Sequence, residues 1–330
     1  MATFDSASHA QAVWKETLEY ISRLHSPWVR QWFGELVPVE LSAGVLTIRA
    51  TTTIQQQYLA GKCRDIFNEA AQAVTGNLVM VSFITGDNAG GGLARFGDSY
   101  DDVILSPDYV FDNFVVGPCN QLAYAASKAV SESPARSYNP LFIHGGCGLG
   151  KTHLLQATCQ EILRRSPESR ILYLSCDSFI NHFIDCVQKG DMQEFRYRYR
   201  HVDVIVIDDI HFLTRRDRTQ EEFFHTFNTL FQAGKQIILS SDAPPNEIPD
   251  LEDRLVSRFN SGLVARVDKP CFETRIAIVT KKSRLRGAAL PEGLRRGQLL
   301  RLHQCGRHVP DGTGRKERPR ARDAALSEGV

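Results

Sequence analysis

The sequence predicts an α/β protein with a P-loop core, in which helices flank a parallel sheet, and a small α+β domain before it. Four short, almost continuous apolar runs alternate with helical stretches, at residues 141–143, 171–174, 204–207 and 237–239. Such runs are typical of parallel strands that are buried on both faces of a sheet. A glycine-rich phosphate-loop pattern follows the first run directly, as it does in P-loop proteins.

The first 84 residues predict the small α+β domain. Apolar side chains recur there at helical spacing, and we expect them on one buried face: Trp14, Leu18, Ile21 and Leu24. Residues 45–49 alternate like a strand, residues 58–74 return to helical spacing, and residues 79–84 predict a last strand.

Changes in composition mark the other boundaries. A glycine-rich stretch predicts a flexible linker over residues 85–104, and the ATP-binding domain is expected over residues 105–293. Residues 294–330 contain eight arginines and one lysine against four acids and show poor apolar periodicity. This tail therefore does not predict a packed domain.

Bulk properties exclude several classes of protein. With 39 basic and 38 acidic residues the net charge is +1, so no overall charge draws the chain to nucleic acid or membrane. No apolar run reaches membrane-spanning length, and the first twelve residues lack a signal-peptide pattern. The eight cysteines are scattered without a Cys-x-x-Cys pair, which favours reduced thiols and a cytoplasmic location.

The strongest local signal is the segment 145–152, which fits G-x-x-x-x-G-K-[ST] at every fixed position. Its glycines allow backbone N–H groups to surround phosphate oxygens, and the helix that follows presents its positive end to the same anion. Lys151 is expected to reach the terminal phosphates of ATP, and the Thr152 hydroxyl to bind Mg²⁺. The alternative is a glycine-rich turn with a lysine placed by chance.

A pair of acids, Asp208 and Asp209, ends the apolar run at 204–207. A buried strand delivers such residues to the sheet edge where ligands bind in open α/β sheets. We expect Asp208 to hold Mg²⁺ and Asp209 to position or activate water. Taken alone, Asp-Asp after a strand is often a polar turn, but its place beyond the P-loop strengthens the interpretation.

These two motifs, Gly-Gly-x-Gly-Leu-Gly-Lys-Thr-His-Leu and Asp-Asp-Ile-x-Phe-Leu, resemble those of the bacterial replication initiator DnaA family of AAA+ ATPases. Four further stretches resemble the same family, at residues 109–120, 220–228, 237–242 and 251–259. The close resemblance covers roughly residues 105–290.

The resemblance implies roles for particular residues. Asp209, the sensor Asp242, and two arginines that reach a neighbouring subunit's ATP, Arg254 and Arg258, would act in catalysis. The residues implied in ATP or ADP binding are Val116, Gly117, Asn120, Gly146, Gly148, Leu149, Gly150, Lys151, Thr152 and His153.

Each of these assignments has a simpler alternative. Arg254 and Arg258 lie four apart and could pair with Glu252 or Asp253 on the surface. Asp242 could form a turn, and aromatic residues such as Phe114 could belong to the core.

Two segments are candidates for binding nucleic acid. Residues 196–200 alternate arginine with tyrosine, a composition suited to phosphates and stacked bases, although a solvated helix face with inward tyrosines fits equally well. The family's single-strand-binding surface instead corresponds to Ile184, Lys189 and Arg218.

The resemblance implies an initiator that assembles with ATP as a homo-oligomer on origin DNA, opens the duplex and recruits the replicative helicase through its N-terminal domain. It also implies slow Mg²⁺-dependent ATP hydrolysis and, by family likeness alone, contact with acidic phospholipid. The family's helical lid and helix-turn-helix domain have no counterpart in residues 294–330.

We expect a shift of reading frame near residue 293, and the alternative is a genuine arginine-rich tail that binds DNA nonspecifically. Two other functions stay open: a truncated regulator or helicase-loader-like ATPase without origin recognition, and an inert interaction module.

Overall fold

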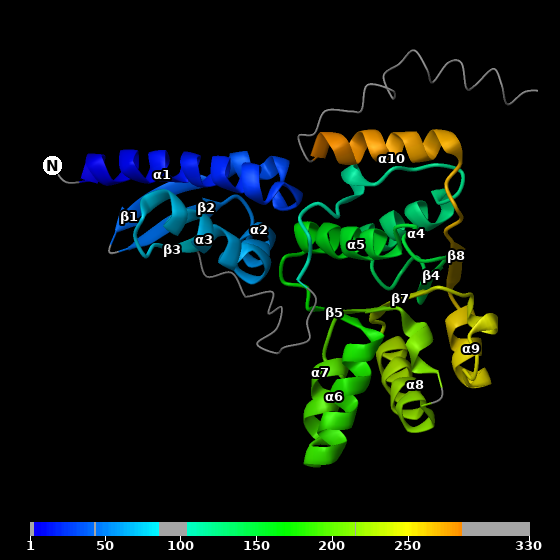
Figure 1. Cartoon of the computed structure of the whole chain (residues 1–330). Helices are drawn as coiled ribbons and strands as arrows, with labels where there is room; N and C mark the ends of the chain where they lie inside the picture. The colour runs from blue at the N-terminus through cyan, green and yellow to red at the C-terminus, as the bar shows by residue number, and fades with distance from the viewer. Residues whose placement is uncertain (1–2, 43, 86–103, 215, 286–330) are drawn as a thin grey trace, which may run out of the picture. The chain divides into compact units, whose positions relative to one another are not determined.

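The computed structural model describes residues 3–42, 44–85, 104–214 and 216–285 (Figure 1). Nearly all of the predicted linker and the whole arginine-rich tail lie outside these described residues.

The N-terminal region is the predicted α+β unit. Its sheet has the order β1-β2-β3, with β1 antiparallel and β3 parallel to the central strand. Its elements are α1 (Thr3–Leu24), β1 (Val37–Ser42), β2 (Val45–Ala50), α2 (Thr53–Tyr58), α3 (Arg64–Thr75) and β3 (Met80–Thr85). Trp14 of α1 stacks on Phe67 of α3 with ring centroids 5.3 Å apart, so aromatic contacts hold the helices over the sheet. The expectation for Leu24 is wrong: it ends α1 with 64% of its surface exposed, because the helix runs beyond the packed core.

The core of the chain is a five-stranded, all-parallel sheet, which confirms the predicted fold class. The strand order is β5-β6-β7-β4-β8. The strands are β4 (Leu141–His144), β5 (Ile171–Ser175), β6 (Val204–Asp208), β7 (Gln236–Ser241) and β8 (Leu263–Arg266). Strands β4 to β7 contain the four predicted apolar runs, whereas β8 was not predicted from the sequence.

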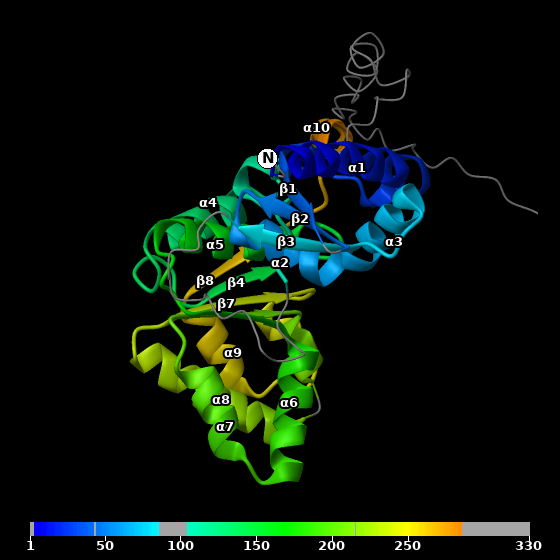
Figure 2. The ribbon, with the colours of Figure 1, turned by 90° about the vertical axis from the view of Figure 1, so that its left-hand side faces the viewer.

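Helices cover both faces of this sheet (Figure 2). Those on one face are α4 (Gln121–Glu132) and α5 (Lys151–Arg165). Those on the other are α6 (Cys176–Lys189), α7 (Met192–Arg200), α8 (Asp217–Gln232) and α9 (Asp253–Asn260). Along β4, Leu141 and Ile143 pack in the core between the sheet and helices α4 and α5. Phe142, which lies between them, packs in the core on the opposite face, with helices α6 to α9. Burial on both faces explains why the strands read as continuous apolar runs.

The topology brings the predicted motifs to one edge of the sheet. The P-loop follows β4, the acid pair ends β6, and Asp242 follows β7, which lies between β4 and β6. Because parallel strands all end at the same edge, three segments far apart in sequence become neighbours there. The last described helix, α10 (Phe272–Leu285), follows β8.

Asp203 ties together the opposite ends of three strands. Its carboxylate accepts hydrogen bonds from the Arg170 backbone N–H (3.0 Å) and from Lys235 Nζ (2.9 Å). Asp203 immediately precedes β6, Arg170 precedes β5 and Lys235 precedes β7. Burial by itself would raise the pKa of Asp203, but the bonds from Arg170 and Lys235 hold it well below the usual range.

We therefore expect Asp203→Asn to lower the free energy of unfolding at neutral pH. A depressed pKa in the folded state stabilises the protein above the unfolded-state pKa of about 3.9, and this contribution is lost as pH falls below it. Urea denaturation at several pH values should show a constant gap between parent and variant down to about pH 5. The gap should close only at more acidic pH, whereas Glu168→Gln, at an exposed control site, should show none. A gap that persists unchanged in acid would contradict the assignment.

Candidate functional site

The phosphate loop has a backbone that requires glycine at its first position. Gly145 has φ 154°, and a Cβ at this position would collide with the carbonyl oxygen of Val267. The Gly145 N–H donates to the Ser241 carbonyl (3.1 Å), and the Val267 N–H donates to the His144 carbonyl (2.7 Å). The loop entrance is thus bonded to the ends of both strands that flank β4.

Lys151 begins α5 and is almost fully buried, with 5% of its surface exposed. Its ammonium group donates to the carbonyl oxygens of Gly145 (2.8 Å) and Gly146 (3.3 Å). It also forms an ion pair with Asp242 at 2.6 Å. A buried cation needs such compensation, and the predicted sensor residue supplies the negative charge.

Asp208 is the centre of a group of hydroxyls. Its Oδ2 accepts hydrogen bonds from Thr152 Oγ1 and from the Tyr173 hydroxyl, each at 2.8 Å. The Ser240 hydroxyl donates to Oδ1. The predicted metal-binding pair, Thr152 and Asp208, is therefore brought together. Tyr173 and Ser240 are two positioning residues that the sequence analysis missed.

Asp209 adopts the left-handed backbone conformation, with φ 58°. Its backbone N–H donates to the Ser240 hydroxyl oxygen at 2.9 Å, so one serine contacts both acids of the pair. Burial, followed by the negative charge of Asp208, raises the pKa of the Asp209 carboxyl. Both effects favour a carboxyl that takes up a proton more readily than a solvated aspartate does.

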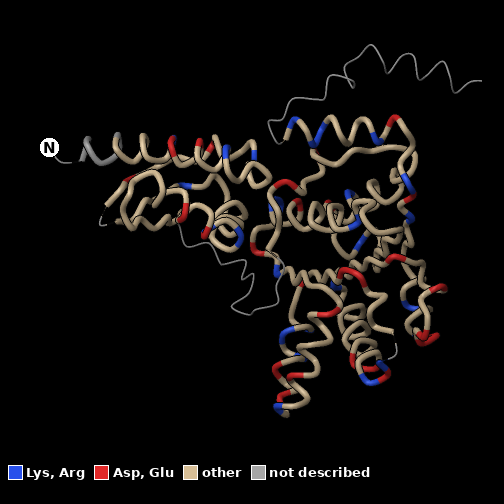
Figure 3. Tube along the Cα trace, viewed as in Figure 1, with Lys and Arg blue, Asp and Glu red and all other residues tan. Residues whose placement is uncertain are grey.

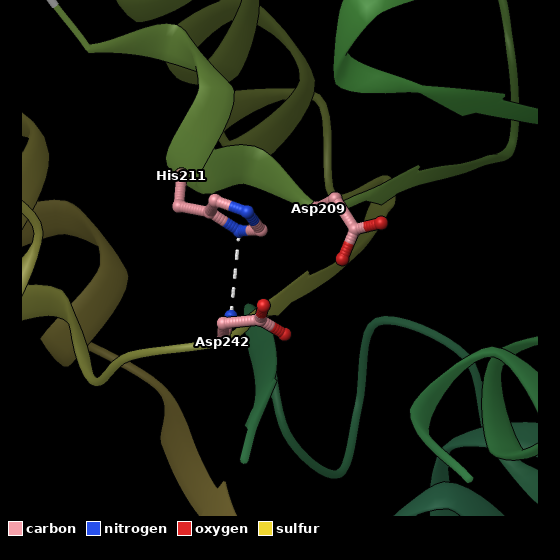
Figure 4. Close-up of side chains that lie close together, drawn as sticks. All are labelled: Asp209, His211 and Asp242. Atoms are coloured by element: carbon pink, nitrogen blue, oxygen red, sulfur yellow. Dashed lines mark hydrogen bonds between the residues drawn. The ribbon is translucent and has the colours of Figure 1, made fainter. Parts of the chain in front are cut away.

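His211 is a third residue that the sequence analysis missed. Its imidazole lies beside Asp209 and Asp242, and one ligand atom from each of the three lies within 4.8 Å of the others (Figure 4). The Asp242 backbone N–H donates to His211 Nδ1 at 3.4 Å, a bond that requires Nδ1 to be the unprotonated nitrogen. The pattern Asp-Asp-Ile-His carries the only sequence signal for it, since His211 lies two residues beyond the acid pair.

The segment that contains Val116, Gly117 and Asn120, which are implied in ATP or ADP binding, is fixed by its own hydrogen bonds. The buried Asn120 accepts from the Gly117 N–H (2.9 Å) and donates to the Val115 carbonyl (3.0 Å), while Val116 is exposed. A Cβ on Gly117 would collide with Thr274 of α10. Close packing of α10 therefore accounts for this glycine.

His153 supports the same region. Its Nε2 lies 2.9 Å from the Val110 carbonyl oxygen, and its ring stacks on Tyr109. Burial lowers the pKa of the imidazole, which favours the neutral form with Nε2 as donor. Phe114 packs in the core beside it, as the simpler alternative held.

The two arginines of α9 differ in their contacts. Arg254 pairs with Glu252 and lies over the Phe224 ring at 4.6 Å, so the simpler alternative for Arg254 agrees with this geometry. Arg258, in the last turn of α9, is partly buried. Among the described residues, neither arginine bonds to Lys151 or Asp208.

The residues predicted to bind single strands lie on the face of the sheet opposite α5. Ile184 and Lys189 are exposed on α6, and Arg218 is exposed in the first turn of α8. Basic and acidic positions are mixed along these helices and α7 (Figure 3). The face formed by these helices is therefore not a uniform basic stripe.

The arginine–tyrosine run of α7 has a structural role. Arg196 and Arg200 both pair with the buried Glu222 of α8, at 3.1 and 2.8 Å. Tyr199 is buried in the core, whereas Tyr197 is 68% exposed. Two of the three cations thus bind α7 to α8, and of the two tyrosines only Tyr199 packs inward as the alternative held.

A parallel sheet with a phosphate loop, an adjoining acid pair and a sensor residue on the neighbouring strand defines a P-loop ATPase of the AAA+ class. The sequence profile of the bacterial DnaA ATPase domain matches residues 105–266. Domain III of the Thermotoga maritima replication initiation protein DnaA is 46% identical, with a TM-score of 0.56, over 58% of this chain and 79% of that one. The chain belongs to the DnaA family.

Two longer DnaA structures are also similar. AMPPCP-bound DnaA from Aquifex aeolicus is 41% identical with a TM-score of 0.55, over 58% of this chain and 59% of that one. A replication initiator DnaA bound to AMPPCP and single-stranded DNA is 39% identical with a TM-score of 0.54, over 62% and 64%. The chain therefore spans less than two thirds of each of these relatives. In the described part of the chain, no helix is long and apolar enough to cross a membrane.

The three hydroxyls that donate to Asp208 give a test of the site's internal structure. Tyr173→Phe removes one donor to a buried carboxylate, and a hydrogen bond to a charged group contributes about 1.5–3 kcal/mol. We expect the free energy of unfolding in urea to fall by about this amount. The matched change at the exposed Tyr197, to Phe, should leave it unchanged. Equal stability of the two variants would show that the Tyr173 hydroxyl contributes nothing.

Proposed function

We propose that this protein is an ATP-dependent replication initiator, in which ATP acts mainly as a switch for assembly. The observation that carries the proposal is the convergence of Lys151, Thr152, Asp208 and Asp242 at one sheet edge. The AMPPCP complexes of two similar DnaA proteins support nucleotide binding by this chain.

The residues around Thr152 fit a magnesium ion. The Thr152 hydroxyl and the Asp208 carboxylate are the hard oxygen ligands that Mg²⁺ prefers, and they lie 2.8 Å apart. When bound, the ion would neutralise phosphate charge. Lys151 would exchange its bonds to the loop carbonyls for phosphate oxygens, while the loop N–H groups hold the same anion.

Asp209 is the residue that we assign to the attacking water. Its carboxyl is half-buried, and the bond from its backbone to Ser240 fixes the direction in which it leaves the strand. Asp is one methylene shorter than Glu, so its reach to a water proton is less favourable. Slow hydrolysis would keep the ATP state long enough for assembly.

The nucleotide site is tested by Lys151→Ala. Loss of a charge-assisted contact costs about 1.5–3 kcal/mol, so ATP affinity should fall roughly 10- to 150-fold. Titration with a fluorescent ATP analogue measures the change, and circular dichroism establishes that the variant is folded despite the unpaired Asp242. Lys189→Ala, an exposed lysine on α6, is the control and should bind ATP as the parent does. Unchanged affinity in Lys151→Ala would remove the proposal.

The same proposal includes origin DNA. We infer that Ile184, Lys189 and Arg218 hold one strand of an opened duplex, and that the N-terminal region recruits the replicative helicase. The DnaA complex with AMPPCP and single-stranded DNA supports the first inference by similarity. A few cations in each subunit give weak, salt-sensitive binding, which assembly multiplies through effective concentration.

Arg258→Ala tests whether assembly links ATP to DNA. We expect this variant to bind ATP normally, because the arginine would serve the ATP of the adjacent subunit. Single-strand binding should lose its enhancement by ATP, which fluorescence anisotropy at low salt would detect. Arg164→Ala, at an exposed position of α5, is the matched control and should keep the enhancement. Enhancement that survives in Arg258→Ala would show that assembly does not depend on this arginine.

A further inference from the structure

A histidine and two carboxylates meet at the edge of the core sheet, beside the proposed Mg²⁺ ligands. Asp209 follows β6, His211 lies two residues further on in a one-turn 3₁₀ helix, and Asp242 follows β7. One ligand atom from each of the three lies within 4.8 Å of the other two (Figure 4). Neither proposed Mg²⁺ ligand belongs to this group, so its three side chains form a second set with metal-binding chemistry.

The backbone fixes two of these side chains in place. Asp209 adopts the left-handed conformation, and its N–H donates to the Ser240 hydroxyl oxygen at 2.9 Å. The Thr214 hydroxyl donates to the His211 carbonyl at 2.6 Å, which closes the turn that carries the imidazole. Ligands that are positioned before an ion arrives lose less conformational entropy when it binds.

The three side chains have lone pairs to offer. The Asp242 backbone N–H donates to His211 Nδ1 at 3.4 Å, a distance at which a hydrogen bond is weak. A metal ion would therefore take the Nδ1 lone pair at little cost. A carboxylate has two oxygens, and the ion pair with Lys151 uses only Oδ1 of Asp242.

Solvent reaches this group of side chains. The Asp242 side chain is 45% exposed, and Asp209 and His211 are both partly buried. An ion can therefore enter from solution and complete its coordination with water, as zinc does at sites with three protein ligands.

Charge and ligand type indicate which ion fits. The carboxylates of Asp208, Asp209 and Asp242 gather near the ammonium group of Lys151, which neutralises only one of them. The remaining negative charge favours a divalent cation. Mg²⁺ is bound by oxygen ligands, whereas imidazole suits Zn²⁺. A set of one imidazole and two carboxylates thus favours Zn²⁺ over Mg²⁺.

We propose that Asp209, His211 and Asp242 bind Zn²⁺, and that the bound ion slows ATP hydrolysis. The second part rests on the proposed role of Asp209 at the attacking water. A carboxylate that coordinates Zn²⁺ accepts a proton from water less readily, because the ion draws off its electron density. The proposed Mg²⁺ ligands lie outside the zinc site, so ATP stays bound while its hydrolysis is held back. The ion prolongs the state in which the protein assembles.

Isothermal titration calorimetry of Zn²⁺ into the untagged full chain, without nucleotide, measures the site directly. Loss of a group that merely orients a metal ligand costs about 10- to 100-fold in affinity, so loss of a ligand itself should cost at least about tenfold. We expect this loss in His211→Gln and, independently, in Asp209→Asn, with circular dichroism to establish that both are folded. The matched control is His225→Gln, at an exposed histidine on α8, which should bind Zn²⁺ as the parent does.

A thiol is the competing ligand. Cys147 is exposed in the phosphate loop, and thiolates bind Zn²⁺ strongly. Cys147→Ser should nevertheless keep the zinc affinity of the parent. Zinc binding that His211→Gln and Asp209→Asn leave unchanged would overturn the proposed site, whichever cysteine then holds the ion.

Single-turnover ATP hydrolysis in excess Mg²⁺ tests the regulatory part, with each protein compared with itself at zero and at saturating buffered Zn²⁺. General base catalysis contributes about 10²- to 10⁴-fold, so Zn²⁺ should slow the parent at least about tenfold and His211→Gln less than about twofold. A parent that hydrolyses no ATP would contradict the proposed function, while calorimetry would still decide the zinc site. A parent that binds Zn²⁺ through His211 yet hydrolyses ATP at an unchanged rate would overturn the inhibition alone.

Discussion

Five parallel strands with helices on both faces can be connected only by segments that cross from one end of the sheet to the other. Every strand then finishes at the same edge, and whatever follows it lies beside whatever follows its neighbours. The meeting of Lys151 with Asp242, and of Thr152 with Asp208, depends on the placement of β7 between β4 and β6. The burial of both sheet faces makes this order rigid, since Phe142 and its neighbours Leu141 and Ile143 are anchored in separate cores.

Motif spacing and apolar runs were enough to predict strands β4 to β7 of the core sheet, the phosphate loop and the acid pair, because these depend on residues close together in sequence. β8 escaped prediction because residues 263–266 form a short run that ends in arginine and is only partly buried. β1 contains Pro38 and an irregular register with β2, so its alternation is broken. The N-terminal fold class was still predictable, because its central strand and helices carry regular patterns.

The residues that orient the site were harder to find. Tyr173 and Ser240 are ordinary strand residues in sequence, and they reach Asp208 only because β5 and β7 flank β6. The same limit applies to the α7 arginines. Composition alone offers phosphate binding, but Glu222 lies on a helix from a later part of the chain and pairs with them when α7 meets α8. Partners that are distant in sequence decide which charges stay available.

The entrance of the phosphate loop is joined by backbone hydrogen bonds to residues at the ends of β7 and β8, through Ser241 and Val267. The conformational entropy of this part of the loop is therefore lost when the sheet folds, rather than when a ligand arrives. An incoming triphosphate would meet a loop whose first residue is already held in place, and none of its binding free energy would be consumed in ordering that residue. Affinity for the anion thus becomes a property of sheet assembly, and damage to β8, a strand with no catalytic residue, would weaken nucleotide binding from a distance.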